Sequence, residues 1–131
     1  MGKISGTFQV NSWEEKPYNE SGSGRKFSRA SVKQSYFGEL AGQGSIEYTL
    51  CYQSDKTSNF IGIELFEGSV NGRPGSFAIQ HVGRFENGVA KSSWHIISES
   101  GAGELCDLSG KGDFETTGPK EATFNFEFEF V

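Results

Sequence analysis

The segment TFNFEFEF, residues 123–130, alternates phenylalanine with other residues over its whole length. Successive side chains of a β-strand point to opposite faces, so the four phenylalanines share one face and the intervening asparagine and glutamates share the other. Such a strand needs a core on one side and water on the other. This end of the chain is therefore expected to be a half-buried strand of an antiparallel sheet.

The rest of the chain follows the same pattern. Its 131 residues include 18 glycines and 12 phenylalanines, and aromatic residues alternate with polar ones between frequent glycines. These features are typical of short antiparallel strands. The length suits one domain, residues 1–131. We expect strands over residues 3–13, 27–38, 42–53, 58–70, 75–85, 89–98, 108–116 and 121–131. Without covering helices, eight such strands stack as a sandwich or close as a barrel.

Two connections stand out from these strands. Residues 14–26 form the longest polar stretch, and we expect an irregular loop there that acts as a mobile flap. The segment SGAGELCDL, residues 100–108, is expected to form a single helical turn. Cys51 and Cys106 lie far apart in different contexts, which indicates two ordinary thiols rather than a disulfide.

Charge and hydropathy restrict the partners. The chain has 12 basic and 17 acidic residues and a formal charge of −5, which disfavours nucleic acid and anionic membranes as partners. No apolar stretch is long enough to span a membrane, and residues 1–10 contain no apolar signal core, so a cytoplasmic location is expected. The spacing of Cys and His suggests no metal site, and no cofactor is expected.

Two Asn-Gly pairs predict the register of three consecutive strands, because two-residue hairpin turns need positive φ at both central positions. The pair at Asn71 and Gly72 would place Phe66 opposite Phe77, and Gly62 opposite His81. The pair at Asn87 and Gly88 would place Phe85 opposite Ala90, His81 opposite Trp94, and Ile79 opposite Ile96. Directly opposed residues point to the same side of a sheet.

One face of this three-strand unit is the richest apolar set in the chain, and we expect it to be the interior. His81 would lie there between Gly62, which leaves space, and Trp94, which forms a wall. Glu64 is the diagonal neighbour of His81. The expected interior set is Phe60, Gly62, Glu64, Phe66, Phe77, Ile79, His81, Phe85, Trp94 and Ile96.

The opposite face of the same strands is also apolar. A strand that is apolar on both faces is generally buried on both faces, so a second copy of the chain is the expected cover. We therefore expect a homo-oligomer, with a dimer favoured. The residues concerned are Ile61, Ile63, Leu65, Ala78, Val82 and Ile97.

Several motifs resemble the DUF3224 family along nearly the whole chain. They are GTFQVNSWEEKPY, FIGIELFEG, GSFAIQHVG, SGAGEL and LSGKGDF. The resemblance implies a small closed antiparallel eight-stranded β-barrel, allene oxide cyclase-like and calycin-like, with no assigned biochemical function. The polar members of these motifs fall on Glu47, Glu64, His81 and Glu104.

Glu64 and His81 are the candidate catalytic pair. An inward carboxylate in an apolar face is costly unless it is paired, so the two side chains could simply satisfy each other. They could instead serve as acid and base inside a pocket. Alternation turns Tyr48 inward and Glu47 outward, but the connection at residues 54–58 leaves the register open. Glu104 lies in a glycine-rich turn that it could cap.

Two functions remain open from the sequence. The first is a barrel that binds a small, largely apolar molecule, with or without cofactor-free isomerase, cyclase or hydrolase chemistry. Its candidate ligand-binding residues are Glu47, Tyr48, Phe66, Phe77, Trp94 and Glu104. The second is a non-catalytic interaction module whose interior is filled by side chains.

Overall fold

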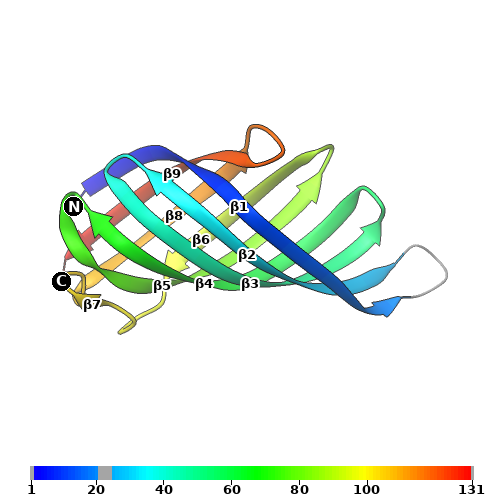
Figure 1. The fold of residues 1–131 in the computed structure, drawn as a ribbon, viewed down its shortest axis with the longest axis horizontal. Coiled ribbons are helices and arrows are strands. Elements are labelled where there is room, and N and C mark those ends of the chain that lie inside the picture. Colours follow the sequence, from blue (N-terminus) through cyan, green and yellow to red (C-terminus); the bar gives the residue numbers. More distant parts are fainter. Residues whose placement is uncertain (1, 21–24, 131) are drawn as a thin grey trace.

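A computed structural model describes all residues except 1, 21–24 and 131. Strands make up most of it, joined by tight turns (Figure 1). The strands are β1 (Gly2–Glu20), β2 (Lys26–Phe37), β3 (Leu40–Ser54), β4 (Thr57–Val70), β5 (Arg73–Glu86), β6 (Val89–Ile96), β7 (Ala102–Gly103), β8 (Leu108–Thr116) and β9 (Glu121–Phe130).

Eight of these strands pair antiparallel in a closed ring. The order is β1, β2, β3, β4, β5, β6, β8 and β9, and β9 pairs again with β1 through residues 121–128. The two-residue strand β7 lies outside the ring and pairs with the start of β5. The all-β class and the antiparallel arrangement expected from the sequence are confirmed.

Both Asn-Gly hairpins have the expected register. Asn71 and Gly72 have φ of 49° and 82°, and Asn87 and Gly88 have φ of 56° and 78°. The pairs Gly62–His81 and His81–Trp94 follow, with Phe66–Phe77 and Ile79–Ile96 on the same face. These turns therefore determine which side chains β4, β5 and β6 direct into the ring.

The first strand is longer than the sequence indicated. Residues 14–20 of the expected loop instead continue β1, whose residues 12–20 pair with residues 26–33 of β2, and the hairpin projects beyond the other turns (Figure 1). Its mostly polar side chains predict a loop, but the half-buried Glu15 anchors the segment by accepting hydrogen bonds from Ser28 of β2 and Tyr52 of β3. The remaining part of the expected flap, residues 21–24, lies outside the described residues.

The segment 100–108 forms β7 and a hydrogen-bonded turn rather than a helix. The amide of Leu105 donates to the carbonyl of Ala102, and that of Leu108 donates to the carbonyl of Leu105. The Leu105 side chain is fully buried at this end of the ring. Cys51 and Cys106 are both free thiols.

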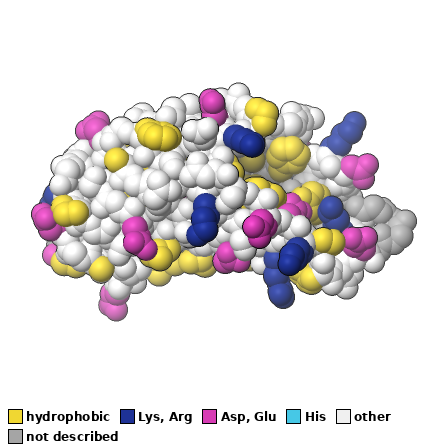
Figure 2. Space-filling view, viewed as in Figure 1, with side chains coloured by type: hydrophobic (Ala, Val, Ile, Leu, Met, Phe, Trp, Pro, Cys, Tyr) yellow, Lys and Arg dark blue, Asp and Glu magenta, His cyan; other side chains and the backbone are white. Residues whose placement is uncertain are grey.

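The interior is packed unevenly along the ring. Near β7, phenylalanines fill it: Phe66 stacks on Phe77 with ring centroids 4.9 Å apart, and Phe126 stacks on Phe128 at 5.2 Å. Burying each such side chain contributes about 2–3 kcal/mol. The opposite end, where the β3–β4, β5–β6 and β8–β9 turns lie, is hollow, and Figure 2 shows hydrophobic side chains inside a depression with charged side chains around it.

The outer face of β4 and β5 carries large apolar side chains. Ile61 and Val82 face each other across these strands and are 57% and 54% exposed, and Ile63 and Leu65, further along β4, are also exposed. In the described part of the chain, no segment is a helix with the length and hydropathy required to cross a membrane.

Candidate functional site

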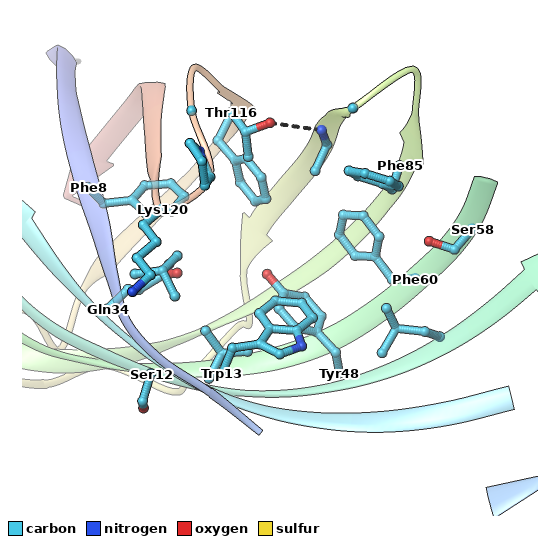
Figure 3. Close-up of a pocket in the computed structure, with 18 of the residues that line it drawn as sticks. Phe8, Ser12, Trp13, Gln34, Tyr48, Ser58, Phe60, Phe85, Thr116 and Lys120 are labelled. Carbon is cyan, nitrogen blue, oxygen red and sulfur yellow. Dashed lines mark hydrogen bonds between the residues drawn. The ribbon is translucent and has the colours of Figure 1, made fainter. Parts of the chain in front are cut away.

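The candidate site is a cavity of about 700 Å³ at the hollow end of the ring. Its walls come mainly from aromatic and aliphatic side chains of β1, β2, β3, β4 and β8. The β3–β4, β5–β6 and β8–β9 turns border its opening, and Figure 3 shows the last two of them. A hydrogen bond of 2.9 Å from the Ala90 amide to the Thr116 hydroxyl joins two of these hairpins. Its lining includes the side chains of Phe8, Trp13, Gln34, Tyr48, Phe60 and Phe114.

The space expected beside Gly62 is occupied. A Cβ at Gly62 would lie 2.5 Å from the Tyr48 ring, so the missing side chain makes room for this tyrosine. Gly83 accommodates the Phe60 ring in the same way. The glycines of the inner wall therefore allow large aromatic rings to lie flat against it, and the free volume lies above those rings, nearer to the hairpin turns.

Gln34 and Tyr48 form the floor of the cavity. Beneath them lies a hydrogen-bonded network centred on Glu64. His81 Nε2 lies 2.6 Å from Glu64 Oε1, and the Tyr36 hydroxyl donates to Glu64 Oε2 at 2.6 Å. Gln34 Nε2 approaches the same Oε2 at 3.4 Å and lies 2.9 Å from the Tyr36 oxygen. The expected contact between Glu64 and His81 is present, and the carboxylate receives hydrogen bonds from three side chains on two strands, β2 and β5.

His81 is held on both ring nitrogens. Since Nε2 faces a carboxylate, it carries a proton, and Nδ1 lies 3.1 Å from the Ser92 hydroxyl. Aromatic rings surround the imidazole, with centroids 5.7 Å away for Phe114, 5.9 Å for Tyr48 and 6.2 Å for Trp94. The ring orientation is thus determined by hydrogen bonds and packing together.

Neither member of the candidate catalytic pair lines the cavity. Glu64 is 0% exposed and His81 is 1% exposed. Among the described residues, every fully buried side-chain nitrogen or oxygen has a hydrogen-bond partner. The pair therefore has the geometry of a satisfied internal contact, separated from the cavity by Gln34 and Tyr48.

Gln34, Tyr36 and Ser92 were not identified from the sequence. Alternation in the segment 26–37 places Gln34 and Tyr36 on the same face as Ala30 and Val32, so the pattern contained a usable signal. Two polar residues following two apolar ones on an inward face predict an internal hydrogen-bonded network.

Burial raises the pKa of both inward tyrosines above the ordinary value. For Tyr48, burial is the main cause and the Glu64 carboxylate adds to it. For Tyr36, burial is again the largest cause, followed by the charge of Glu64 and the hydrogen bond to it. Both hydroxyls therefore keep their protons, and that of Tyr36 donates to Glu64.

The remaining candidate residues lie elsewhere. The structure turns Tyr48 inward and Glu47 outward, where Glu47 accepts a 2.8 Å hydrogen bond from Ser31. Glu104 is exposed in the turn after β7, and its backbone amide donates to the carbonyl of Pro74.

Three aromatic candidates also lie away from the cavity wall. Phe66 and Phe77 are in the filled end, and Trp94 packs against Phe126 with ring centroids 5.2 Å apart. Of the candidates, Tyr48 is the one in the cavity wall. The inward face of these strands could be predicted from alternation and turn register, but not which end of that face is hollow.

A second polar cluster holds the mouth of the cavity. Glu15 Oε2 accepts hydrogen bonds of 2.6 Å from Ser28 and Tyr52, and Oε1 accepts one of 3.0 Å from the Trp13 indole. Burial raises the pKa of Glu15, but these hydrogen bonds and the charge of Lys26 outweigh it and lower the pKa below its ordinary value. The ionised carboxylate fixes Trp13, whose ring centroid lies 6.0 Å from that of Tyr48.

Within the described residues, no group of three or more His, Cys, Asp or Glu side chains is placed to hold a metal ion. The polar groups that reach the cavity are hydroxyls, amides and the charged side chains at its mouth. This arrangement can bind an apolar molecule and orient it through a few hydrogen bonds.

Comparison with known proteins identifies the family. The model of the family described as "Protein of unknown function (DUF3224)" matches residues 4–128. The chain belongs to the DUF3224 family. A crystal structure of a DUF3224 protein of unknown function from Shewanella oneidensis MR-1 is similar, with 25% sequence identity and a TM-score of 0.78. The likeness covers 100% of this chain and 98% of that one. No curated protein matches this DUF3224 chain.

Proposed function

We propose that this DUF3224 protein binds a small, largely apolar molecule in the cavity at the hairpin end of the ring. The observation that carries the proposal is the uneven packing of the interior, which is filled with phenylalanine at one end and hollow over about 700 Å³ at the other. Natural ligand sites have volumes of roughly 300–1,000 Å³ and mostly apolar walls with a few polar groups.

The cavity wall supports this function because its side chains hold one another in place. The Tyr48 ring packs edge-on against Phe60 at 5.2 Å, and Phe8 packs edge-on against Phe114 at 5.2 Å. Trp13 is held over the mouth by Glu15. A wall that is already ordered loses little conformational entropy when a ligand binds.

A test uses the apolar dye Nile red, whose emission rises when it leaves water. Ala90 lines the cavity, so the substitution Ala90→Trp places an indole in the free volume. We expect the parent protein to bind the dye and Ala90→Trp to lose binding while still unfolding cooperatively. Ala102→Trp, at the exposed strand β7 on the opposite end, is the matched control and should bind as the parent does. Equal binding by parent and Ala90→Trp would place the dye elsewhere and refute the proposal.

Acid–base chemistry by Glu64 and His81 is not part of this proposal. A general base must come within about 2.6–3.2 Å of the proton that it removes. Here Gln34 and Tyr48 stand between the pair and the cavity, and the carboxylate oxygens already accept hydrogen bonds from His81 and Tyr36.

The alternative is a non-catalytic interaction module that assembles with its own copies. The exposed apolar side chains of β4 and β5 favour it, because monomers rarely expose a contiguous patch of this kind. Sedimentation of the parent and of Ile63→Lys tests it, with Thr123→Lys on the outer face of β9 as control. Assembly predicts a dimer for the parent and the control, and a monomer for Ile63→Lys. A monomeric parent at high concentration would reject it.

The pairing of eight strands in a ring supports a closed barrel. The allene oxide cyclase-like kinship, the single domain and the cytoplasmic location stay predictions from the sequence.

A further inference from the structure

Two polar side chains form the floor of the cavity. Gln34 comes from β2 and Tyr48 from β3, and both are almost fully buried at 2% and 6% exposure. Figure 3 shows them on the same side of the cavity, with Phe8 and Phe60 to either side. The hydrogen-bonding capacity of these two groups therefore decides which polar group a bound molecule should carry.

The network beneath the floor fixes the orientation of the Gln34 amide. Its Nε2 lies 2.9 Å from the Tyr36 oxygen and 3.4 Å from Glu64 Oε2. The Tyr36 hydroxyl donates its hydrogen bond to Glu64, so both neighbours of this amide group accept hydrogen bonds from it. An amide oxygen in that position would face two acceptors. The NH₂ group therefore points into the network, and the carbonyl oxygen Oε1 points away from it, towards the cavity.

Tyr48 offers the complementary group. Phe60 and His81 hold its ring from two sides, with centroids 5.2 Å and 5.9 Å away. Burial and the nearby Glu64 carboxylate keep its pKa high, so the phenol carries its proton. The floor thus combines a hydrogen-bond acceptor at Gln34 with a hydroxyl at Tyr48 that can donate.

The possible polar groups of a ligand match this floor to different extents. A hydroxyl donates one hydrogen bond and accepts others, so it can satisfy both groups at once. A carboxylate has no donor for the Gln34 oxygen and would lose its hydration above Glu64. A plain hydrocarbon would leave both groups without partners, which is costly once water is excluded.

We infer that the molecule bound in this cavity is neutral and carries a hydroxyl group, an alcohol or a phenol on an apolar body, that donates to Gln34 Oε1 and accepts from Tyr48. This inference rests on the proposed binding function and names the chemical class of the ligand. Lys120 stands at the mouth of the cavity and is the feature that would favour an anionic ligand instead.

The test compares naphthol, naphthoate and methylnaphthalene, substituted at the same carbon, as competitors of Nile red at neutral pH. These probes share one apolar body and differ in the group that reaches the floor. We expect naphthol to bind the parent protein on the order of tenfold more tightly than methylnaphthalene, since it gains two hydrogen bonds. Tyr48→Phe removes one hydroxyl and keeps the ring. It should weaken naphthol binding about three- to tenfold and leave methylnaphthalene unchanged.

Several results would overturn the inference while leaving the binding function intact. Equal affinities of naphthol and methylnaphthalene would show that the floor does not recognise a hydroxyl group. Tightest binding of naphthoate, lost in Lys120→Met, would show an anion site at the mouth. Nile red binding that no naphthalene displaces would also reject the hydroxyl class. Failure of the parent to bind Nile red would instead refute the proposed function itself.

Discussion

His81 Nε2 lies 2.6 Å from Glu64 Oε1, and neither side chain has contact with solvent. The two residues come from adjacent strands, β5 and β4, and each makes a further hydrogen bond, His81 to Ser92 and Glu64 to Tyr36. A buried chain of this kind connects β2, β4, β5 and β6 across the interior. Its contribution is to hold the cavity floor in one arrangement.

The first prediction concerns the loss of the Glu64 charge. Glu64→Gln should lower the free energy of unfolding by about 3 kcal/mol, because an NH₂ group replaces one of the two carboxylate oxygens and leaves either His81 or Tyr36 without its acceptor in a fully buried site. Urea unfolding followed by circular dichroism measures this change. Glu47→Gln, on the outer face of the adjacent strand, is the control and should change stability by less than about 0.5 kcal/mol. Equal effects of the two substitutions would contradict a structural role for the buried network.

A second prediction follows from the close approach of Glu64 to Gly44. A Cβ at Gly44 would overlap with Glu64 Oε2 and lie 3.1 Å from Cε1 of Tyr36. Gly44→Ala should therefore destabilise the protein by about 1–3 kcal/mol through overpacking. Gly118→Ala is the matched control, since a Cβ there meets no atom within 4 Å. Thermal unfolding that ranks the two variants the other way would show that the carboxylate lies elsewhere.

A third prediction compares phenylalanines at the two ends of the ring. Phe77 is fully buried in the filled end, whereas Phe85 is half-buried and lines the cavity. We expect Phe77→Ala to cost about 3–5 kcal/mol, because it leaves a new void among close-packed rings. Phe85→Ala removes fewer contacts and should cost about 1 kcal/mol. Similar denaturation midpoints for both variants would mean that the interior is evenly packed.

The fourth prediction concerns pH and the mouth of the cavity. The folded state lowers the pKa of Glu15, so folding favours its ionised form. The resulting stabilisation is present above the ordinary carboxyl pKa and is lost as the pH falls through the lowered folded value. Acidification should therefore free the Trp13 indole and increase its quenching by iodide. Glu15→Gln should remove this pH dependence, and the same iodide titration in both proteins at each pH decides the matter. A pH dependence retained in Glu15→Gln would assign the change to another group.

The register of the central strands could be predicted because it depends on local chemistry. An Asn-Gly pair permits a tight turn of one geometry, and the pairing of Gly62 with His81 and of His81 with Trp94 follows by counting. The contact between Glu64 and His81 followed from the same count. Tyr48 also points inward, as alternation favoured, although the adjacent turn left the alternative of Glu47 open.

The place of the cavity could not be predicted because it depends on contacts across the ring. Tyr48 lies over Gly62 and Phe60 lies over Gly83, so the glycines of the inner wall mark rings rather than empty space. The length of β1 was missed for a related reason. Its second half is held by hydrogen bonds that Glu15 accepts from Ser28 and Tyr52, and hydrophobic alternation in the sequence does not reveal such contacts.

The projecting part of β1 has a consequence for how the chain tolerates change. Residues 12–20 pair with β2, whereas the pairing of β1 with β9 stops at Gln9. Residues can therefore be inserted or deleted in this projecting β1–β2 hairpin, the same number in each strand, without shifting any side chain of the closed ring. Lys16 and Pro17 lie along its free edge, and such residues discourage a foreign strand from adding there. We therefore expect variants in which this projecting hairpin is longer or shorter to be recovered as folded, non-aggregating proteins.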